Sequence, residues 1–79
     1  MITIEQCRAA RALLDWSAEI LAKSAGVGVA TVRRYESGMS VAAGSLSAIE
    51  DAFSAAGVTF IDAGEASPAG GQGVRFDPT

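Results

Sequence analysis

The sequence of 79 residues contains no histidine and a single cysteine, Cys7. It therefore cannot form an internal disulfide, and it lacks the side chains of an ordinary His/Cys metal site. It also lacks a glycine-rich phosphate loop followed by lysine, and no nucleophile stands beside paired carboxylates. We expect a protein that is not an enzyme, uses no cofactor or metal, and is held together by packing or by an oligomer partner.

Long apolar runs are absent as well. No segment approaches the ~18 consecutive apolar residues of a membrane span, and Glu5 comes before any apolar leader could form. Together with the single cysteine, these absences predict a cytoplasmic protein without a signal peptide or a membrane partner. A chain of this length is expected to form one small domain that buries only about 60% of its unfolded surface.

Charged side chains are few, and their distribution is uneven. The formal net charge is −3; residues 1–37 hold five basic and four acidic side chains, whereas residues 38–79 hold one and five. A negative net charge argues against binding nucleic acid through bulk electrostatics, because phosphate contacts need lysine or arginine. The mildly basic first half would still orient the chain toward DNA.

Apolar residues recur at helical spacing as far as residue 56, and capping residues mark where helices begin. Thr3 and Gln6 form a capping-box pattern, and Ser17 is a suitable N-cap for a second helix. Gly57 ends the last helix. The predicted helices run from about Ile4 to Leu14, between Ser17 and Gly26, from about Val29 to Ser37, and from Gly44 or Ser45 to Ala56.

The segment Ala18–Ser37 has the pattern of two helices joined by a tight turn. Gly26 can adopt the left-handed backbone that closes a helix, Val27 is expected to point inward beneath the turn, and Gly28 begins the next helix. Ala22 is small at the point where the two helices would cross, so their backbones can approach closely.

This segment resembles the helix-turn-helix of the Cro and phage-repressor (XRE) type, found in bacterial and phage DNA-binding regulators. The likeness covers roughly residues 3–57. It implies a mainly α fold, a compact four-helix lambda-repressor-like bundle, with an ion pair between Arg11 and Glu36 that joins the first and third helices. The residues that occupy the family's apolar and glycine positions are Leu21, Ala22, Gly26, Val27, Val32 and Tyr35.

After Gly57 the apolar period changes from helical to alternating, which predicts two short strands around Val58–Ile61 and Val74–Phe76. We expect an antiparallel hairpin across a flexible loop from Ala63 to Gly73. Residues 1–57 would form the DNA-binding domain, and residues 58–79 a strand-loop-strand extension. An isolated hairpin is marginal in water, so these strands must pack on the helices or pair with a second chain. We favour a homodimer through the C-terminal strands; a hairpin lying on the first helix is the alternative.

The third helix is the candidate recognition helix. Val29 and Ala30 could contact thymine methyl groups in the major groove, and Arg34 could reach guanine or phosphate. Ala18, Gly28 and Val29 lack the polar groups that the resembled family usually carries, so sequence readout should be weak or mostly apolar. The candidate DNA-binding residues are Gly28, Val29, Ala30, Thr31, Arg33, Arg34 and Ser37, with Lys23 and Ser40 as contacts to the DNA backbone.

The sequence thus predicts a small sequence-selective transcriptional regulator whose partner is double-stranded DNA and whose third helix lies in the major groove. The alternative is a protein-interaction or antitoxin-like module that keeps the helix-turn-helix as a scaffold. The acidic C-terminal half favours the alternative, and Arg33 with Arg34 favours DNA. The operator sequence, the direction of regulation and any effector ligand are not encoded in a readable form.

Overall fold

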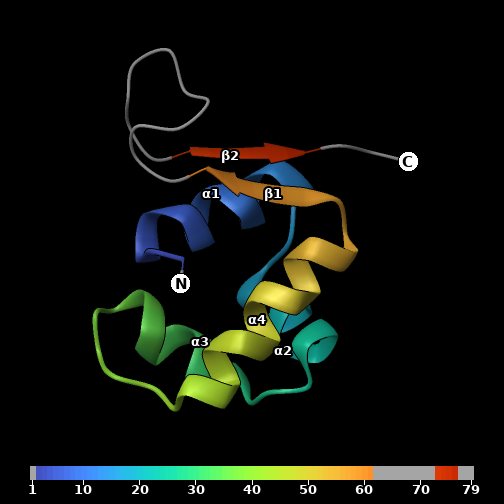
Figure 1. Ribbon diagram of the computed structural model, residues 1–79. Coiled ribbons are helices and arrows are strands. Elements are labelled where there is room, and N and C mark those ends of the chain that lie inside the picture. The colour runs from blue at the N-terminus through green and yellow to red at the C-terminus, as the bar shows by residue number, and fades with distance from the viewer. Residues whose placement is uncertain (1, 62–72, 77–79) are drawn as a thin grey trace.

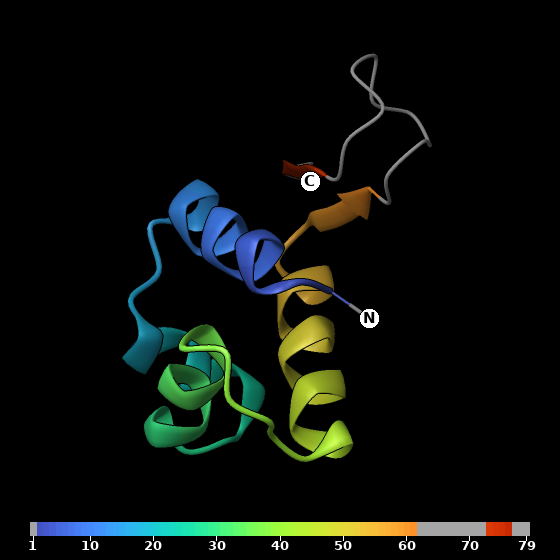
Figure 2. The same ribbon diagram turned by 90° about the vertical axis from the view of Figure 1, so that its left-hand side faces the viewer.

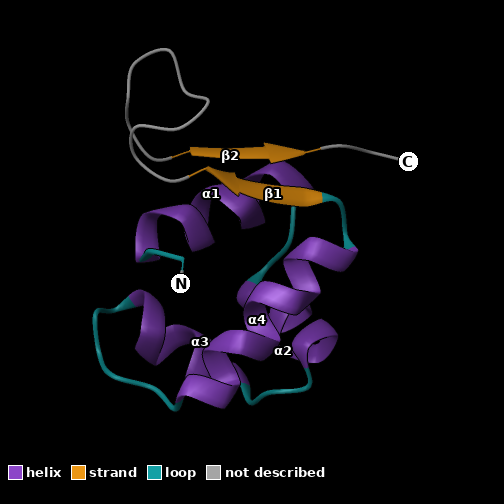
Figure 3. Ribbon diagram, viewed as in Figure 1, coloured by secondary structure: helices purple, strands orange, loops and turns teal. Residues whose placement is uncertain are grey.

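The computed structural model describes residues 2–61 and 73–76, and the expected loop from Ala63 lies almost wholly outside them. Within these ranges the chain forms helices and then a pair of strands (Figures 1 and 3). The mainly helical fold class with a small C-terminal antiparallel sheet is confirmed. The elements are α1 (Ile4–Leu14), α2 (Ala18–Ala25), α3 (Val29–Glu36), α4 (Ala43–Ala55), β1 (Val58–Ile61) and β2 (Gly73–Phe76).

The first two helices begin at the capping residues that the sequence indicates. The Gln6 backbone N–H donates to Thr3 Oγ1 at 3.1 Å, and the Thr3 N–H donates to Gln6 Oε1 at 3.0 Å, which completes a capping box. The Ile20 N–H donates to Ser17 Oγ at 3.1 Å at the start of α2. By contrast, α3 and α4 begin at Gly28 and Ala42 without a side-chain cap, so their first N–H groups are left for other acceptors.

The turn between α2 and α3 depends on glycine. Gly26 has a φ of 73°, in the left-handed region, and its N–H donates to the Lys23 carbonyl at 3.3 Å. The Val27 N–H then reaches back to the Ala22 carbonyl at 3.0 Å, which closes the end of α2. α3 can therefore start three residues after Gly26, at Val29, and pack across α2, as expected for a helix-turn-helix.

One apolar core joins all four helices and the first strand. Leu21, Val32, Ile49 and Phe53 have no exposed surface, and Val58 of β1 is only 3% exposed. Trp16 is half-buried at the edge of this core and stacks on Phe53, with ring centroids 5.8 Å apart. The other buried apolar residues are Ile2, Cys7, Ala10, Ala22 and Leu46.

The two strands pair with each other inside the chain. β1 and β2 are antiparallel, with Val58 opposite Phe76 and Phe60 opposite Val74. The sheet lies against α1 and the end of α4, at the end of the molecule away from α2 and α3 (Figures 1 and 2). Phe60 meets the edge of Phe53 at 5.8 Å, and Gln6 Nε2 donates to the Ile61 carbonyl at 3.1 Å. Strand pairing therefore needs no second chain, and the alternative of a hairpin on the first helix is the arrangement observed.

Candidate nucleic-acid interface

α3 has one face in the core and one in solvent. Val32 and Glu36 are buried, whereas Val29 and Thr31 are half-buried. The remaining predicted contact residues are all exposed, and they lie on the helix or at its two ends: Gly28, Ala30, Arg33, Arg34 and Ser37. Ser37 directs its hydroxyl to the Arg33 carbonyl at 2.8 Å, so it offers its oxygen lone pairs rather than its proton to a ligand.

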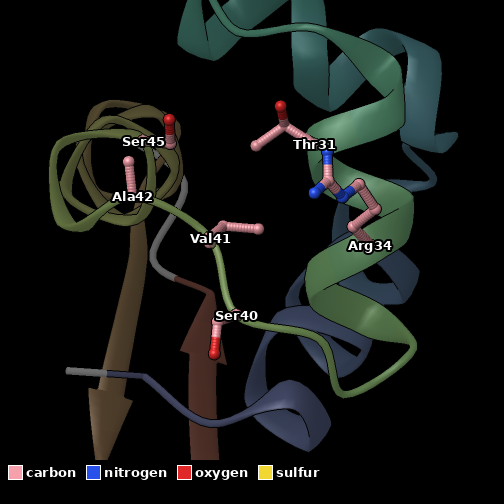
Figure 4. A pocket seen from close by; sticks show the side chains of 6 residues that line it. All are labelled: Thr31, Arg34, Ser40, Val41, Ala42 and Ser45. Carbon is pink, nitrogen blue, oxygen red and sulfur yellow. The ribbon is translucent and has the colours of Figure 1, made fainter.

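A hollow lies between α3 and the start of α4, and we call it the α3–α4 hollow. It has a volume of about 260 Å³ and is lined by Thr31, Arg34, Ser40, Val41, Ala42 and Ser45. Figure 4 shows Arg34 and Thr31 together on α3, with Ser45 across from them at the start of α4. The Arg34 guanidinium, the side chains of Thr31 and Ser45 and the uncapped N-terminus of α4 thus border the same space, a combination that favours an anion, while the Ser40 hydroxyl points away from Arg34 in Figure 4.

The structure brings together three predicted contact residues, Thr31, Arg34 and Ser40, at this hollow. Lys23 is exposed on α2 and does not line it. Ser45 and the start of α4 were not predicted to belong to the site, because Ala42 and Ala43 carry none of the side chains that usually mark a helix N-terminus.

Arg33 lies on another flank of α3 and forms an ion pair with α2. Its Nη2 is 2.6 Å from Glu19 Oε2, and the two side chains are 57% and 63% exposed. The pKa of Glu19 lies below its usual range, because its carboxylate accepts a hydrogen bond from its own backbone N–H and because the charge of Arg33 is close. The Arg33–Glu19 pair was not predicted, because no local pattern indicates a contact across 14 positions.

A denser network fixes the C-terminal end of α3 to α1. Arg11 binds Glu36 through two hydrogen bonds, from Nε to Oε2 at 2.8 Å and from Nη2 to Oε1 at 2.7 Å. These are the two residues that the resemblance pairs. Arg8 adds a donor to the Glu36 carbonyl at 2.7 Å, and Cys7 Sγ donates to Glu36 Oε2 at 3.2 Å. Arg8 stands one turn before Arg11, on the same side of α1, but its role depends on tertiary packing that the sequence did not reveal.

This network determines the protonation of its members. Burial alone would raise the pKa of Glu36, but hydrogen bonds from Arg11 and Cys7 and the charges of Arg11 and Arg8 outweigh it, so the pKa is lowered. Burial and the hydrogen bond to Glu36 raise the pKa of Cys7 to about 12. Cys7 is therefore a neutral thiol in the core, not a nucleophile.

The other side of α3 is fixed by the N-terminal segment. The Tyr35 hydroxyl donates to the Ile2 carbonyl at 2.7 Å, and the Ile2 N–H donates to Glu50 Oε1 of α4 at 2.7 Å. With Arg11 and Arg8, these contacts fix α3 to α1 and to the chain before α1, which is itself bound to α4. The exposed face of α3 is thus presented on a helix whose buried face is bound from several directions.

Within residues 2–61 and 73–76, no helix has the length and apolar character needed to cross a bilayer. The family model described as helix-turn-helix, of the XRE type, matches residues 8–54, more than half of the chain. The match begins inside α1, includes the turn at Gly26 and ends in the last turn of α4. No curated protein matches the sequence.

Proposed function

Because the chain belongs to the XRE-type helix-turn-helix family, whose domains bind DNA and are typically not enzymes, we propose that it is a small sequence-selective transcriptional regulator. In this proposal residues 1–57 bind double-stranded DNA, and α3 lies in the major groove. The observation that carries the proposal is the exposed face of α3, which is bordered by Arg33 on the α2 side and by the α3–α4 hollow on the other.

The size of the exposed face suits a groove. A major groove about 12 Å wide admits an α-helix, and small side chains let the helix approach the base edges closely. Gly28, Val29 and Ala30 stand at the start of α3, so this end would lie deepest. Val29 and Ala30 offer methyl groups, which suit contact with the methyl group of thymine better than contact with the hydrogen-bonding groups of the bases. We therefore propose apolar readout at this end, with Arg34 as the polar contact and Arg33 as a second one only when its ion pair with Glu19 opens.

The α3–α4 hollow is proposed to hold a backbone phosphate. Arg34 would supply the charge, and the N-terminus of α4 would add its N–H groups. The Thr31 hydroxyl would donate a hydrogen bond, as would that of Ser40 after rotation of its side chain. Lys23 on α2 would contact the neighbouring backbone, and Ser37 at the end of α3 would do so once its hydroxyl proton leaves the Arg33 carbonyl. These contacts carry no sequence information, but they would fix the depth and angle of α3.

We also propose that the protein acts as a homodimer whose contact involves residues 58–79. β1 and β2 use one edge each to pair with one another, and in this proposal the other edge of a strand takes the second copy. The sheet lies at the end of the molecule away from α2 and α3, so a dimer made there would leave both recognition helices exposed (Figure 2). Two half-sites would then give the affinity that one small domain lacks.

The test is fluorescence anisotropy with labelled duplex DNA from upstream of the gene and a shuffled duplex, each at about 50 and 200 mM salt. We expect tighter binding to the upstream duplex, with affinity that falls steeply with salt because several phosphates are contacted. Arg34→Ala should weaken binding to both duplexes and make its salt dependence shallower. Arg34→Lys, which keeps the positive charge at this position, is the matched control and should retain most of the salt dependence.

A protein-interaction or antitoxin-like module is the second candidate. It is favoured by the start of α3, where Gly28 gives no side-chain cap and neither Val29 nor Ala30 carries a polar group. Absence of binding to both duplexes at either salt concentration would favour this module. Equal binding to both duplexes would instead indicate a groove binder without sequence readout.

A further inference from the structure

We propose that Glu19 competes with the DNA backbone for Arg33, so that the two exposed arginines of α3 contribute unequally to DNA binding. Arg34 would bind phosphate in the α3–α4 hollow, whereas Arg33 would stay with Glu19 and leave one phosphate contact unmade. The inference rests on the proposed placement of α3 in the major groove. It goes further by assigning to an acidic residue of α2 the control of affinity at that site.

The first support is the difference between the two arginines. Arg33 Nη2 lies 2.6 Å from Glu19 Oε2, a short charge-assisted hydrogen bond. Arg34 forms no ion pair with any residue in the described part of the chain, and it borders a hollow lined by hydroxyls. The adjacent positions 33 and 34 therefore present one neutralised guanidinium and one that is available to an anion.

The second support is the location of Glu19. It stands in the first turn of α2, whose N-terminus begins at Ser17. In a helix-turn-helix docked on DNA, the helix before the recognition helix crosses the phosphate backbone. A phosphate that approaches Arg33 would therefore meet the Glu19 carboxylate at the same place, and it would have to break the ion pair before it could bind. Coulomb repulsion between carboxylate and phosphate adds to this cost.

The third support is that the pair is held in solvent rather than in the core. Both side chains are more than half exposed, so neither is needed to fill space, and the pair can open without disturbing the packing of α2 on α3. Burial makes the Arg11–Glu36 pair different, because Glu36 is 9% exposed. A residue that only supported α3 would be expected in such a buried position. Exposure at the DNA-facing side instead suits a residue that acts on the ligand.

The experiment measures binding of both duplexes to the full chain and to three variants: Glu19→Gln, Arg33→Ala and the double variant. Glu19→Gln should tighten binding to the upstream and the shuffled duplex alike, by about two- to fivefold at about 50 mM salt, the range that an exposed ion pair is worth. Its log–log salt slope should steepen by about 0.9, the amount for one added phosphate contact. Arg33→Ala alone should change affinity less than about twofold, and the double variant should lose the gain of Glu19→Gln.

Asp15→Asn is the matched control, because it removes an exposed negative charge just before α2 without contacting Arg33. Asparagine also tolerates the left-handed backbone at this position, where φ is 56°. Asp15→Asn should produce a smaller gain, and that gain should persist when Arg33 is replaced. An unchanged melting temperature of Glu19→Gln would show that its effect is on binding and not on folding.

The outcomes separate this inference from the proposed function. Suppose that the parent protein binds DNA and that Glu19→Gln binds it equally well or more weakly. The competition between Glu19 and DNA for Arg33 is then refuted, whereas the proposed regulator stands. A gain that survives in the double variant would also refute it, because bulk charge would then be the cause. If only the Glu19→Gln protein binds detectably, both proposals are supported. If no variant binds, both fail.

Discussion

The two ion pairs of α3 have nearly the same length but different surroundings. Arg11–Glu36 measures 2.7 Å and Arg33–Glu19 measures 2.6 Å, yet Glu36 is 9% exposed and Glu19 is 63% exposed. In water, the attraction of a pair is largely offset by hydration and side-chain entropy. In the interior, the loss of one partner leaves the other charge without compensation. Burial, not distance, therefore determines which pair stabilises the fold.

Arg11→Ala is expected to lower the free energy of unfolding by about 3 kcal/mol, because the Glu36 carboxylate would remain charged and buried with only Cys7 as a donor, while Arg8 binds the Glu36 backbone carbonyl. Urea unfolding followed by Trp16 fluorescence would measure the loss. Arg33→Ala is the control, since it breaks the exposed pair and should leave the midpoint nearly unchanged. An unchanged stability of Arg11→Ala would show that the Arg11–Glu36 pair has no structural role.

The Glu36 carboxylate should also make stability depend on pH. Its pKa in the folded protein is lowered, so its contribution is fully present above the unfolded value of about 4.3 and is lost as pH falls toward the folded pKa. The stability of the parent protein should therefore fall more steeply between about pH 5 and pH 3 than that of Glu36→Gln. Unfolding free energies at several pH values would measure this. Two parallel curves across that window would contradict the assignment.

At the scale of the helices, the sequence predicted what local rules determine. The capping box of Thr3, the N-cap Ser17 and the left-handed Gly26 each depend on residues within four positions, and each was found as expected. The start of α4 was placed one or two residues late, because Ala42 carries no capping side chain. The end of α3 was placed one residue late: Ser37 is its C-cap in αR geometry, and Gly38 after it has a φ of 91°.

The parts of the candidate site that the sequence did not reveal are contacts between distant positions. Arg8 reaches the carbonyl of Glu36 across 28 positions, and Glu19 reaches Arg33 across 14. The α3–α4 hollow needs the loop and the start of α4 to fold back beside Thr31. The angle between helices decides all three, and helical periodicity does not encode it. Arg11 and Glu36 were expected as a pair through the family resemblance, not through any local pattern.

Replacing two glycines by alanine would have opposite effects on stability, because one lies in the turn before α3 and the other inside α4. Gly26 has a φ of 73° and open space around it, so Gly26→Ala would meet no neighbour but would place a side chain in the left-handed region, at a cost of about 1–2 kcal/mol. Gly44 lies inside α4, also in open space and without positive φ, so Gly44→Ala should stabilise by about 0.5 kcal/mol. Thermal unfolding would measure both. A stabilising Gly26→Ala would mean that the turn does not require its present geometry.

At the scale of the molecule, the hairpin is part of the core as well as an extension. Val58 is 3% exposed and Phe60 contacts the ring of Phe53, so β1 covers one end of the helical bundle. Gln6 of α1 links the capping box to the end of β1 through the Ile61 carbonyl. The same segment therefore serves the stability of one chain and, in our proposal, the contact between two. Removing it would disturb both, so deletion cannot separate them.

A measurement of mass in solution would separate the role of the hairpin in the fold from its proposed role in the dimer, because the two strands already pair within one chain. If the outer strand edges of two copies pair, light scattering at tens of micromolar should give twice the chain mass of 8.0 kDa, with the mass falling on dilution. Thr59 and Arg75 are exposed, while Val58, Phe60 and Val74 face the core. The contact would then depend on backbone pairing at the edge and not on an apolar face. A mass of one chain across this range would exclude the dimer. DNA binding would then use independent copies on separate half-sites, and each duplex would show the affinity of a single α3.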